Sequence, residues 1–425
     1  MKELFANRNF VKMFTATFAS QFGTIVGNMA FAFFLLDRFS TQPGYASLAE
    51  MMYSLPTLLV FWVVGVTADR FNRQKIAEYS GWIRVMLTVL LVLVIYMEWL
   101  PLAFAVLFLR SAVSKFYAPA ETALLQGVLK PDQYEQASGL NQMLMGLFMM
   151  FGVGLGAVAY QTIGIVGAVA LDGVGLTLSA LLIRKCEVPE AVRQPNGAAS
   201  WRGMKFRKVW SDFAQGLGYI RQKPLLQALI CGFLLFGLLN GGISVLPLYT
   251  MKYKLAPDNY TVYSSLYALF MGVGMLVGSL IGVAIVKKAK PHIVIISGIF
   301  VAGLLVIGLL QATNPWVFLS FVLLVGLILA PVNIAIGGWL PALIDPRQMG
   351  RVSAWYDPLM MLGQTVALGL IAWLYPGTIG LNAIYWSMCI ILLLASFFYL
   401  LTLPRLRRKE EAKVASNSEI QGVSS

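Results

Sequence analysis

The sequence predicts an all-α polytopic membrane protein with twelve transmembrane helices in two six-helix halves. Three observations support this fold class. Hydrophobic residues make up 58% of the 425 residues and charged residues 12%, with a mean hydropathy of +0.74, whereas a soluble domain carries about 25% charged residues. The apolar residues form long runs, each close to the ~20 residues that a helix needs to cross a bilayer. One long polar segment, residues 184–223, divides these runs six and six.

The runs predict twelve spans in chain order: 11–36, 46–69, 76–97, 101–126, 137–160, 163–184, 225–250, 259–286, 291–311, 315–343, 352–375 and 379–402. The predicted divisions are an N-terminal half at 1–184, a cytoplasmic central loop at 185–223, a C-terminal half at 224–403 and a cytoplasmic tail at 404–425. The tail begins with a basic run and becomes rich in serine, so we expect it to be disordered.

Positive charge is distributed very unevenly between the connections. One topology places 27 of the 32 Lys and Arg residues on one side, four of them (Arg70, Arg73, Lys75 and Arg84) assigned to the connection between spans two and three. Short loops rich in Lys and Arg stay cytoplasmic, so we expect both termini inside the cell. This topology and anionic lipid headgroups account for the net charge of +13. We therefore expect membrane lipids, and no nucleic acid, as partners.

Several classes of chemistry lack their motifs. The three cysteines and the single His292 show no metal-ligand or redox spacing. No phosphate-binding G-x-x-x-x-G-K-[ST] sequence and no H-E-x-x-H sequence occurs. We expect no metal, no cofactor, no ATP hydrolysis and no enzymatic activity.

The connection between spans two and three has a distinctive pattern. Gly65, Asp69, Arg70, Arg73 and Lys75 follow the spacing G-x-x-x-D-R-x-x-R-x-K. This resembles the signature loop between helices 2 and 3 of the major facilitator superfamily. The equivalent place in the second half keeps glycines and cations but has no acidic residue. The resemblance implies two halves related by an axis along the membrane normal, with a substrate site between them near the midplane.

Three further stretches resemble the macrolide-efflux-like drug:proton antiporters of that superfamily. They are Arg110–Ala120 with Gly139-Leu140-Asn141, then Leu171–Leu176, then Pro331-Val332-Asn333 with Gly350–Ser353. The sequence departs from this branch at Gly27-Asn28, where many members carry an acidic residue after the glycine. The resemblance implies a transporter of the bacterial cytoplasmic membrane, driven by the proton gradient, and we expect a monomer.

Two charged residues lie deep within predicted spans. Charges inside a membrane are rare and are functional candidates by default. Arg110 in span four matches an arginine that the resemblance associates with proton coupling. Asp172 in span six is the deepest acid, and burial and a nearby cation would act in opposite directions on its affinity for a proton. Asp172 therefore either loads and releases a proton or stays permanently paired with Arg110 or Lys115.

Charged groups near the cytoplasmic ends predict a gate. Glu121 could meet Arg70 or Arg73, and Asp69 could cap the start of span eleven near Arg351. The predicted gate residues are Gly65, Asp69, Arg70, Arg73, Lys75, Glu121, Arg351 and Asp357. Asp37, Arg38 and Glu50 are assigned to the outer rim, where we expect them to be solvated.

Polar, uncharged residues within spans predict the lining of a substrate cavity, because a polar side chain is disfavoured against lipid. They are Gln21, Asn28, Asn141, Gln142, Asn240, Asn333 and Gln364. Few fixed charges among many apolar and amide groups suit a hydrophobic or amphipathic substrate.

The pattern as a whole predicts proton-coupled efflux of such compounds by alternating access. A lysophospholipid or siderophore transporter on the same fold is the alternative within transport. A membrane sensor or scaffold that transports nothing is the alternative outside it, and it leaves the charges inside the membrane without a purpose.

Overall fold

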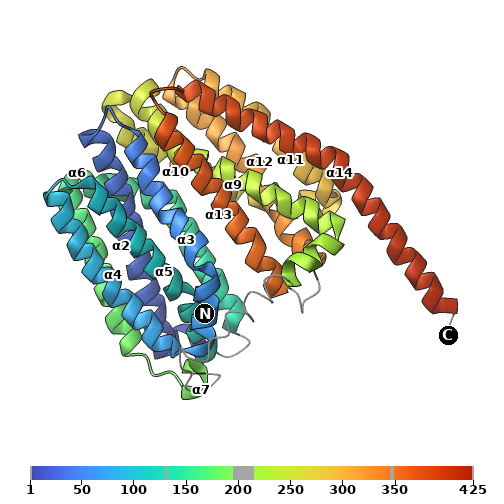
Figure 1. Ribbon diagram of the computed structural model, residues 1–425, viewed down its shortest axis with the longest axis horizontal. Helices are drawn as coiled ribbons and strands as arrows, with labels where there is room; N and C mark the ends of the chain where they lie inside the picture. Colours follow the sequence, from blue (N-terminus) through green and yellow to red (C-terminus); the bar gives the residue numbers. More distant parts are fainter. Residues whose placement is uncertain (1, 130–132, 195–214, 345–348, 424–425) are drawn as a thin grey trace. The chain divides into compact units, whose positions relative to one another are not determined.

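The computed structural model describes residues 2–129, 133–194, 215–344 and 349–423, and within these ranges the chain is helical with no strand (Figure 1). The first half contains α1 (Lys2–Ala6), α2 (Arg8–Arg38), α3 (Gly44–Arg70), α4 (Arg73–Tyr96), α5 (Leu100–Val128), α6 (Tyr134–Arg184) and α7 (Glu190–Arg193). The second half contains α9 (Pro224–Thr250), η3 (Met251–Leu255), η4 (Pro257–Asn259), α10 (Tyr260–Lys288), α11 (Pro291–Gln311), α12 (Pro315–Ala342), α13 (Met349–Leu374) and α14 (Leu381–Val423).

The helix α6 supplies two of the predicted spans. Its 51 residues would reach about 76 Å as one straight helix, far more than a bilayer. Gly164 interrupts it with φ 67° and ψ 179°, a conformation open essentially only to glycine. By length and composition, nine helices among the described residues can cross a membrane. Counting the two parts of α6 separately, and adding α3 and α13, gives the twelve transmembrane helices of the predicted fold class, which is confirmed.

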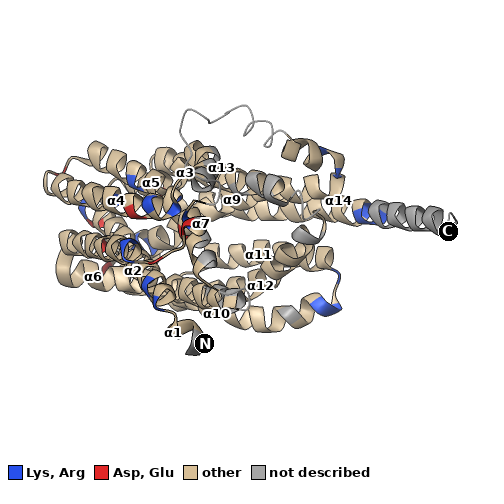
Figure 2. Ribbon diagram, turned by 90° about the horizontal axis from the view of Figure 1, so that it is seen from below, with Lys and Arg blue, Asp and Glu red and all other residues tan. Residues whose placement is uncertain are grey.

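The chain forms two compact units. The first contains Met1–Val209, Ser244–Leu269 and Leu368–Thr378, and the second contains Trp210–Ile243, Phe270–Ala367 and Ile379–Ser425. The first unit thus combines the first half of the chain with one end each of α9, α10 and α13. Figure 2 shows that charged residues lie mainly along α2–α7, whereas α9, α11 and α12 are mostly uncharged.

The last helix is longer than a span. α14 continues past Pro404 to Val423, through the segment that the sequence predicts to be disordered (Figure 1). The residues after Pro404 include Arg, Leu, Lys, Glu and Ala in a nearly continuous run. These residues have high helix propensity, which favours continuation of the helix.

α2 and α6 pack unusually closely because glycines lie at their crossing. A Cβ added to Gly23 would lie 2.7 Å from the Asp172 Cα atom, and one added to Gly175 would lie 2.3 Å from the Ala19 carbonyl oxygen. Gly27 also faces Asp172, one turn along α2. Small residues at such a crossing let two helix backbones approach each other. This approach places Asp172 directly against α2.

A polar network lies at the end of the first unit where α2 ends and α3 begins. Lys252 and the Tyr260 hydroxyl both donate hydrogen bonds to Asp37 Oδ1, at 2.5 and 2.7 Å. The Tyr249 hydroxyl contacts Ser47 Oγ at 2.7 Å. These bonds attach the ends of α9 and α10 to α2 and α3. Asp37 is exposed, as the sequence predicts, and also forms an ion pair with Lys252.

Candidate functional site

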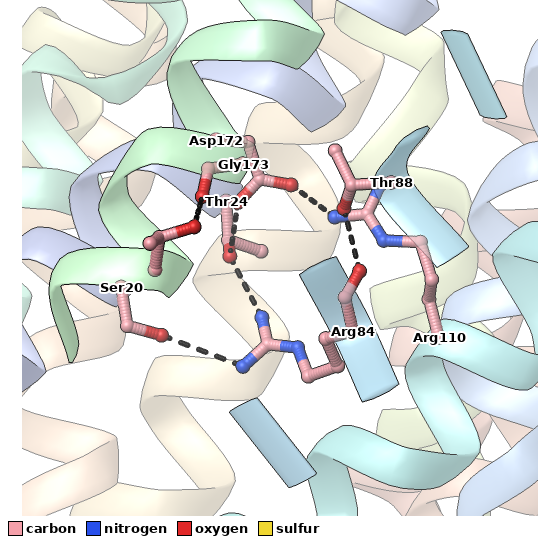
Figure 3. Close-up of polar contacts among 8 residues, drawn as sticks. Ser20, Thr24, Arg84, Thr88, Arg110, Asp172 and Gly173 are labelled. Carbon is pink, nitrogen blue, oxygen red and sulfur yellow. Dashed lines mark hydrogen bonds and ion pairs between the residues drawn. The ribbon is translucent and has the colours of Figure 1, made fainter. Parts of the chain in front are cut away.

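Two arginines and one aspartate from three helices meet inside the first unit (Figure 3). Arg110 of α5 donates a hydrogen bond from Nη2 to Asp172 Oδ2 of α6. The Thr24 hydroxyl of α2 donates to the other carboxylate oxygen, Oδ1, at 2.9 Å. The same hydroxyl accepts from Arg84 Nη2 of α4 at 2.8 Å. We call Thr24, Arg84, Arg110 and Asp172 the buried charge cluster.

Local helix geometry positions the groups of the cluster. Ser20 and Thr24 are four residues apart, so both lie on the face of α2 that meets Arg84. Arg84 Nη1 donates to Ser20 Oγ at 3.4 Å. Thr88, one turn after Arg84, donates its hydroxyl to the Arg84 carbonyl oxygen at 2.8 Å. The hydroxyls of Ser20 and Thr24 thus hold the guanidinium of Arg84 in place. The Thr88 hydroxyl bonds the Arg84 backbone carbonyl oxygen.

All three charged side chains of the cluster are shielded from solvent. The relative exposure is 1% for Asp172, 5% for Arg84 and 6% for Arg110. Asp172 carries one negative charge against two guanidinium groups, one in direct contact and one reached through Thr24. In a medium of low dielectric constant these interactions are much stronger than in water. Any event that neutralises Asp172 would therefore alter both arginine contacts at once.

The sequence leaves open whether Asp172 pairs with Arg110 or with Lys115. In the structure the contact is made by Arg110. The sequence places Arg110 and Asp172 within spans, and the tertiary structure, in which α4 packs against both α5 and α6, brings the two side chains together. Whether Asp172 also exchanges a proton stays a prediction.

The position of Arg84 differs from the one predicted from the sequence. The prediction that Arg84 belongs to the connection between spans two and three is wrong, because Arg84 is the twelfth of the 24 residues of α4 and is buried. The signal that could have found it is its position in the middle of the run 76–97. A cation at that depth is a functional candidate on the same grounds as Arg110.

The predicted gate residues are only partly described. Glu121 accepts a hydrogen bond from the Thr17 hydroxyl of α2, and Arg73 Nη1 donates to the Val192 carbonyl oxygen at 3.3 Å. Lys75 is in the first turn of α4. Position 65 and the side chains of Asp69, Arg70, Arg351 and Asp357 lie outside the described part of the chain. The gate as a unit stays a prediction.

The outer-rim prediction holds for two of its three residues, because Asp37 and Arg38 are both exposed. Arg38 and Glu98 form an exposed ion pair at 2.8 Å, with 56% and 53% of their side chains exposed, and 36% of the Asp37 side chain is exposed beside Lys252. Glu50 is the seventh residue of α3 and is partly buried. The prediction that Glu50 is a solvated rim residue is wrong, because α3 already begins at Gly44 and carries Glu50 two turns into the bundle.

The predicted cavity residues fall into three groups. Asn240 Nδ2 donates to Gln364 Oε1 at 3.1 Å, within the second unit. Gln21 and Asn28 are partly buried, and Asn141 and Asn333 are exposed. The side chain of Gln142 lies outside the described residues. Among the described residues, no three His, Cys, Asp or Glu side chains lie together as a metal site would require.

An apolar groove runs between α4 and the second part of α6. It has a volume of about 520 Å³, within the range of sites that hold small molecules. Its lining is Val85, Thr88, Val89, Val92, Ala170, Gly173, Val174, Thr177, Leu178 and Leu181. Thr88 and Gly173 also adjoin the buried charge cluster, through Arg84 and Asp172 respectively. The groove therefore has hydrophobic walls and a charged network behind them.

Comparisons with known proteins agree on the class of protein. The sequence profile of the Major Facilitator Superfamily matches residues 13–367. The chain is 51% identical over 404 residues to an uncharacterized MFS-type transporter, YkuC, of Bacillus subtilis (strain 168), covering 95% of this chain and 94% of that protein. It is 25% identical to macrolide efflux protein A of Streptococcus pyogenes, covering 83% of this chain and 86% of that protein.

Solved transporter structures share the fold. A crystal structure of a peptide transporter POT mutant in complex with alafosfalin superposes with a TM-score of 0.72 at 14% sequence identity, covering 94% of each chain. A crystal structure of a nucleoside transporter NupG mutant gives a TM-score of 0.68 at 12% identity, covering 92% of this chain and 99% of that one. At these identities the similarity concerns the fold alone.

Proposed function

Because the chain belongs to the major facilitator superfamily, we propose that it exports hydrophobic or amphipathic compounds in exchange for protons, by alternating access. As a member of this superfamily it is a multi-pass membrane transporter, and its relatives give no indication of an enzyme. The proposal adds the direction, the coupling ion and the substrate class. It also places the protein in the bacterial cytoplasmic membrane, as a monomer with both termini in the cytoplasm.

The observation that carries the proton coupling is the buried charge cluster. Asp172 is held by Arg110 on one oxygen and by Thr24 on the other. A proton taken up by Asp172 would remove the charge that both arginines share. Two conformations of the transporter that hold this proton with different affinity would then change in population when it binds. Arg110 and Arg84 are the groups that would respond.

The substrate class rests on the uncharged character of the predicted cavity residues and on one distant relative. Amide side chains such as Asn240 and Gln364 can orient a polar group, and apolar surfaces take up the rest of a bulky compound. Macrolide efflux protein A is similar over most of this chain. Both observations favour a large amphipathic compound over a sugar phosphate or an amino acid.

Reconstituted liposomes test the proposal. With an imposed pH gradient and a pH-sensitive dye inside, macrolides, cationic dyes and lysophospholipids are added one class at a time. We expect one class to trigger proton movement, and Asp172→Asn and Arg110→Ala to abolish it. Glu98→Gln is the matched control, because it removes a carboxylate from an ion pair that is exposed.

The outcomes separate the parts of the proposal. Substrate movement without proton movement contradicts the coupling and keeps the transporter. Equal activity of Asp172→Asn and Glu98→Gln contradicts the role of Asp172. No response to any compound contradicts the proposed substrate class and favours the alternative of a membrane sensor or scaffold that transports nothing.

A second candidate, transport of lysophospholipids, is favoured by the groove between α4 and α6. Its apolar walls and its volume of about 520 Å³ suit one acyl chain better than a polar solute. Leu178 and Val174 line it, so Val174→Trp would fill it. Loss of a lysophospholipid response in Val174→Trp, with the response to cationic dyes preserved, would support the lipid pathway.

A further inference from the structure

The most unusual carboxylate outside the buried charge cluster is Glu50. It lies in the spanning helix α3 and is partly buried. No hydrogen bond or ion pair to Glu50 occurs among the described residues. The charge of Glu50 acts on the Tyr53 hydroxyl, one turn further along α3. An acidic side chain within a membrane span normally pairs with another group, and one without such a partner is a candidate for binding a ligand.

Polar groups without partners accompany Glu50. The Tyr53 hydroxyl, the Thr57 hydroxyl and Arg110 Nε are buried and make no hydrogen bond with any described residue. Buried polar atoms are satisfied in the great majority of cases, so each exception requires an explanation. Glu50, Tyr53 and Thr57 are spaced by three and four residues, which places them on one face of α3.

Tyr53 connects this face of α3 to the buried charge cluster. The charges of Glu50, Arg110 and Asp172 all act on its hydroxyl. The Ser111 hydroxyl donates to the Tyr53 carbonyl oxygen at 2.7 Å, and this bond attaches α3 to α5 next to Arg110. The unpaired carboxylate and the cluster therefore belong to one region of the first unit.

The other carboxylates inside the first unit are already engaged. Asp172 is 1% exposed and holds Arg110 and Thr24, so a bulky ligand has no access to it. Glu121 accepts from Thr17. Glu50 differs from both, because it is only partly buried and its oxygens have no partner among the described residues.

We infer that Glu50 binds the cationic group of the exported compound, with the ring of Tyr53 beside it. This inference rests on the proposed export of amphipathic compounds and narrows the substrate class to cationic amphiphiles. A carboxylate attracts a cation directly, and an aromatic ring one turn away adds attraction through its face.

The nearby arginine does not oppose a cation at Glu50. Of the two arginines of the cluster, Arg110 is the one whose charge acts on Tyr53, and it is in direct contact with Asp172, so this pair presents little net charge to its surroundings. Arg84 leaves the whole cluster with one net positive charge, held behind Thr24. Asp172 and Arg110 thereby have a different task from Glu50: the pair responds to the proton, and Glu50 holds the substrate.

Equilibrium dialysis of the full-length protein in detergent tests the inference. The probes are tetraphenylphosphonium, a permanent cation with four phenyl groups, and triphenylphosphine oxide, a neutral compound with three phenyl groups on phosphorus. We expect Glu50→Gln to weaken tetraphenylphosphonium binding by at least about tenfold and to leave the neutral probe within about twofold. We expect Glu50→Asp, which keeps the charge, to restore most of the affinity. The neutral probe also reports whether each variant is folded.

Glu98→Gln is the matched control, because it removes a carboxylate that is exposed, and it should change neither affinity. Equal binding of tetraphenylphosphonium by Glu50→Gln and the wild type overturns the inference and leaves the proposed export intact. An equal loss of both probes in Glu50→Gln also overturns it, because the effect is then structural. Binding of neither probe by the wild type overturns the proposed substrate class and the inference with it.

Discussion

The two compact units of this transporter are built with the same packing but with different polar chemistry. The first contains the buried charge cluster and all four ion pairs found among the described residues. In the second, the described contacts between spanning helices include an amide pair, Asn240 with Gln364, and hydroxyl bonds from Ser396 and Tyr399 to backbone carbonyl oxygens. Arg407 contacts the ring of His292, and no carboxylate side chain is among the described residues of this unit. The proposed proton coupling therefore rests on groups of the first unit.

Close glycine crossings are what the two units share. In the first unit Gly23 faces α6, and in the second Gly237 faces α13, where an added Cβ would lie 2.0 Å from the Met360 carbonyl oxygen. Both pairs of helices need the small residue for their backbones to approach. Close packing at glycines is thus found in both units, whereas among the described residues buried charged side chains are found in the first alone.

The largest expected effect tests the charge in the first unit. Arg110→Ala or Asp172→Ala alone leaves an uncompensated buried charge, which costs about 3–5 kcal/mol of folding free energy. The double variant removes both charges, so its loss should be well below the sum of the two single losses. Thermal denaturation in detergent measures all three proteins. Additive losses would show that the two residues do not act as a pair.

The next effect tests the packing that the units share. Gly23→Ala and Gly237→Ala each force backbone movement, and both should destabilise by about 1–3 kcal/mol. Gly338→Ala in α12 is the control, because its Cβ would meet nothing within 4 Å, and the replacement of a helical glycine there should be neutral or favourable. A large loss of stability in only one of Gly23→Ala and Gly237→Ala would mean that close packing at a glycine stabilises one unit and not the other.

Removal of the Thr24 hydroxyl, which bridges Arg84 and Asp172, should cause a comparable or smaller loss of stability. This effect is specific to the first unit. Thr24→Val keeps the shape of the side chain and removes the hydrogen bonds to Arg84 and Asp172, for a loss of about 1–3 kcal/mol. Thr24→Ser keeps the hydroxyl and should stay close to the wild type in stability. Proton movement in liposomes should fall with the valine variant and not with serine. Equal stability and equal proton movement in Thr24→Val and Thr24→Ser would show that the Thr24 hydroxyl plays no part in the buried charge cluster.

The smallest effect tests the amide pair of the second unit. Asn240→Ala breaks one uncharged hydrogen bond between α9 and α13, and such bonds in membrane proteins contribute about 0.6 kcal/mol on average. We expect little change in denaturation temperature and no change in the proton coupling. If Asn240→Ala abolished coupling as Asp172→Asn is expected to, the division between a charged and an uncharged unit would be wrong.

The fold was largely predictable because membrane spanning is a local property of the sequence. The predicted span 291–311 has the bounds of α11, and the predicted span 163–184 coincides with the part of α6 that follows Gly164. Hydrophobic length and the positions of charges are sufficient for such predictions. The site was predictable in part, since a charge at the centre of an apolar run is noticeable without a structure, and Arg110 and Asp172 were found in this way.

Arg84 and Glu50 show where such prediction ends. Both lie within the predicted spans 76–97 and 46–69, yet the charge count assigned Arg84 to a connection and Glu50 was assigned to the outer rim. Only the packing of α4 and α3 against their neighbours shows that Arg84 is buried and Glu50 partly buried.

By itself, the sequence determined that this chain spans a membrane with twelve helices in two halves and that two charges lie deep within them. Each of these properties depends on residues close together in the chain. The tertiary structure decided that Asp172 pairs with Arg110, that Thr24 joins the pair to Arg84, and that Glu50 has no such partner among the described residues. Those facts depend on how α2 to α6 pack against one another, since the energy of a buried charge is set by neighbours from distant parts of the chain.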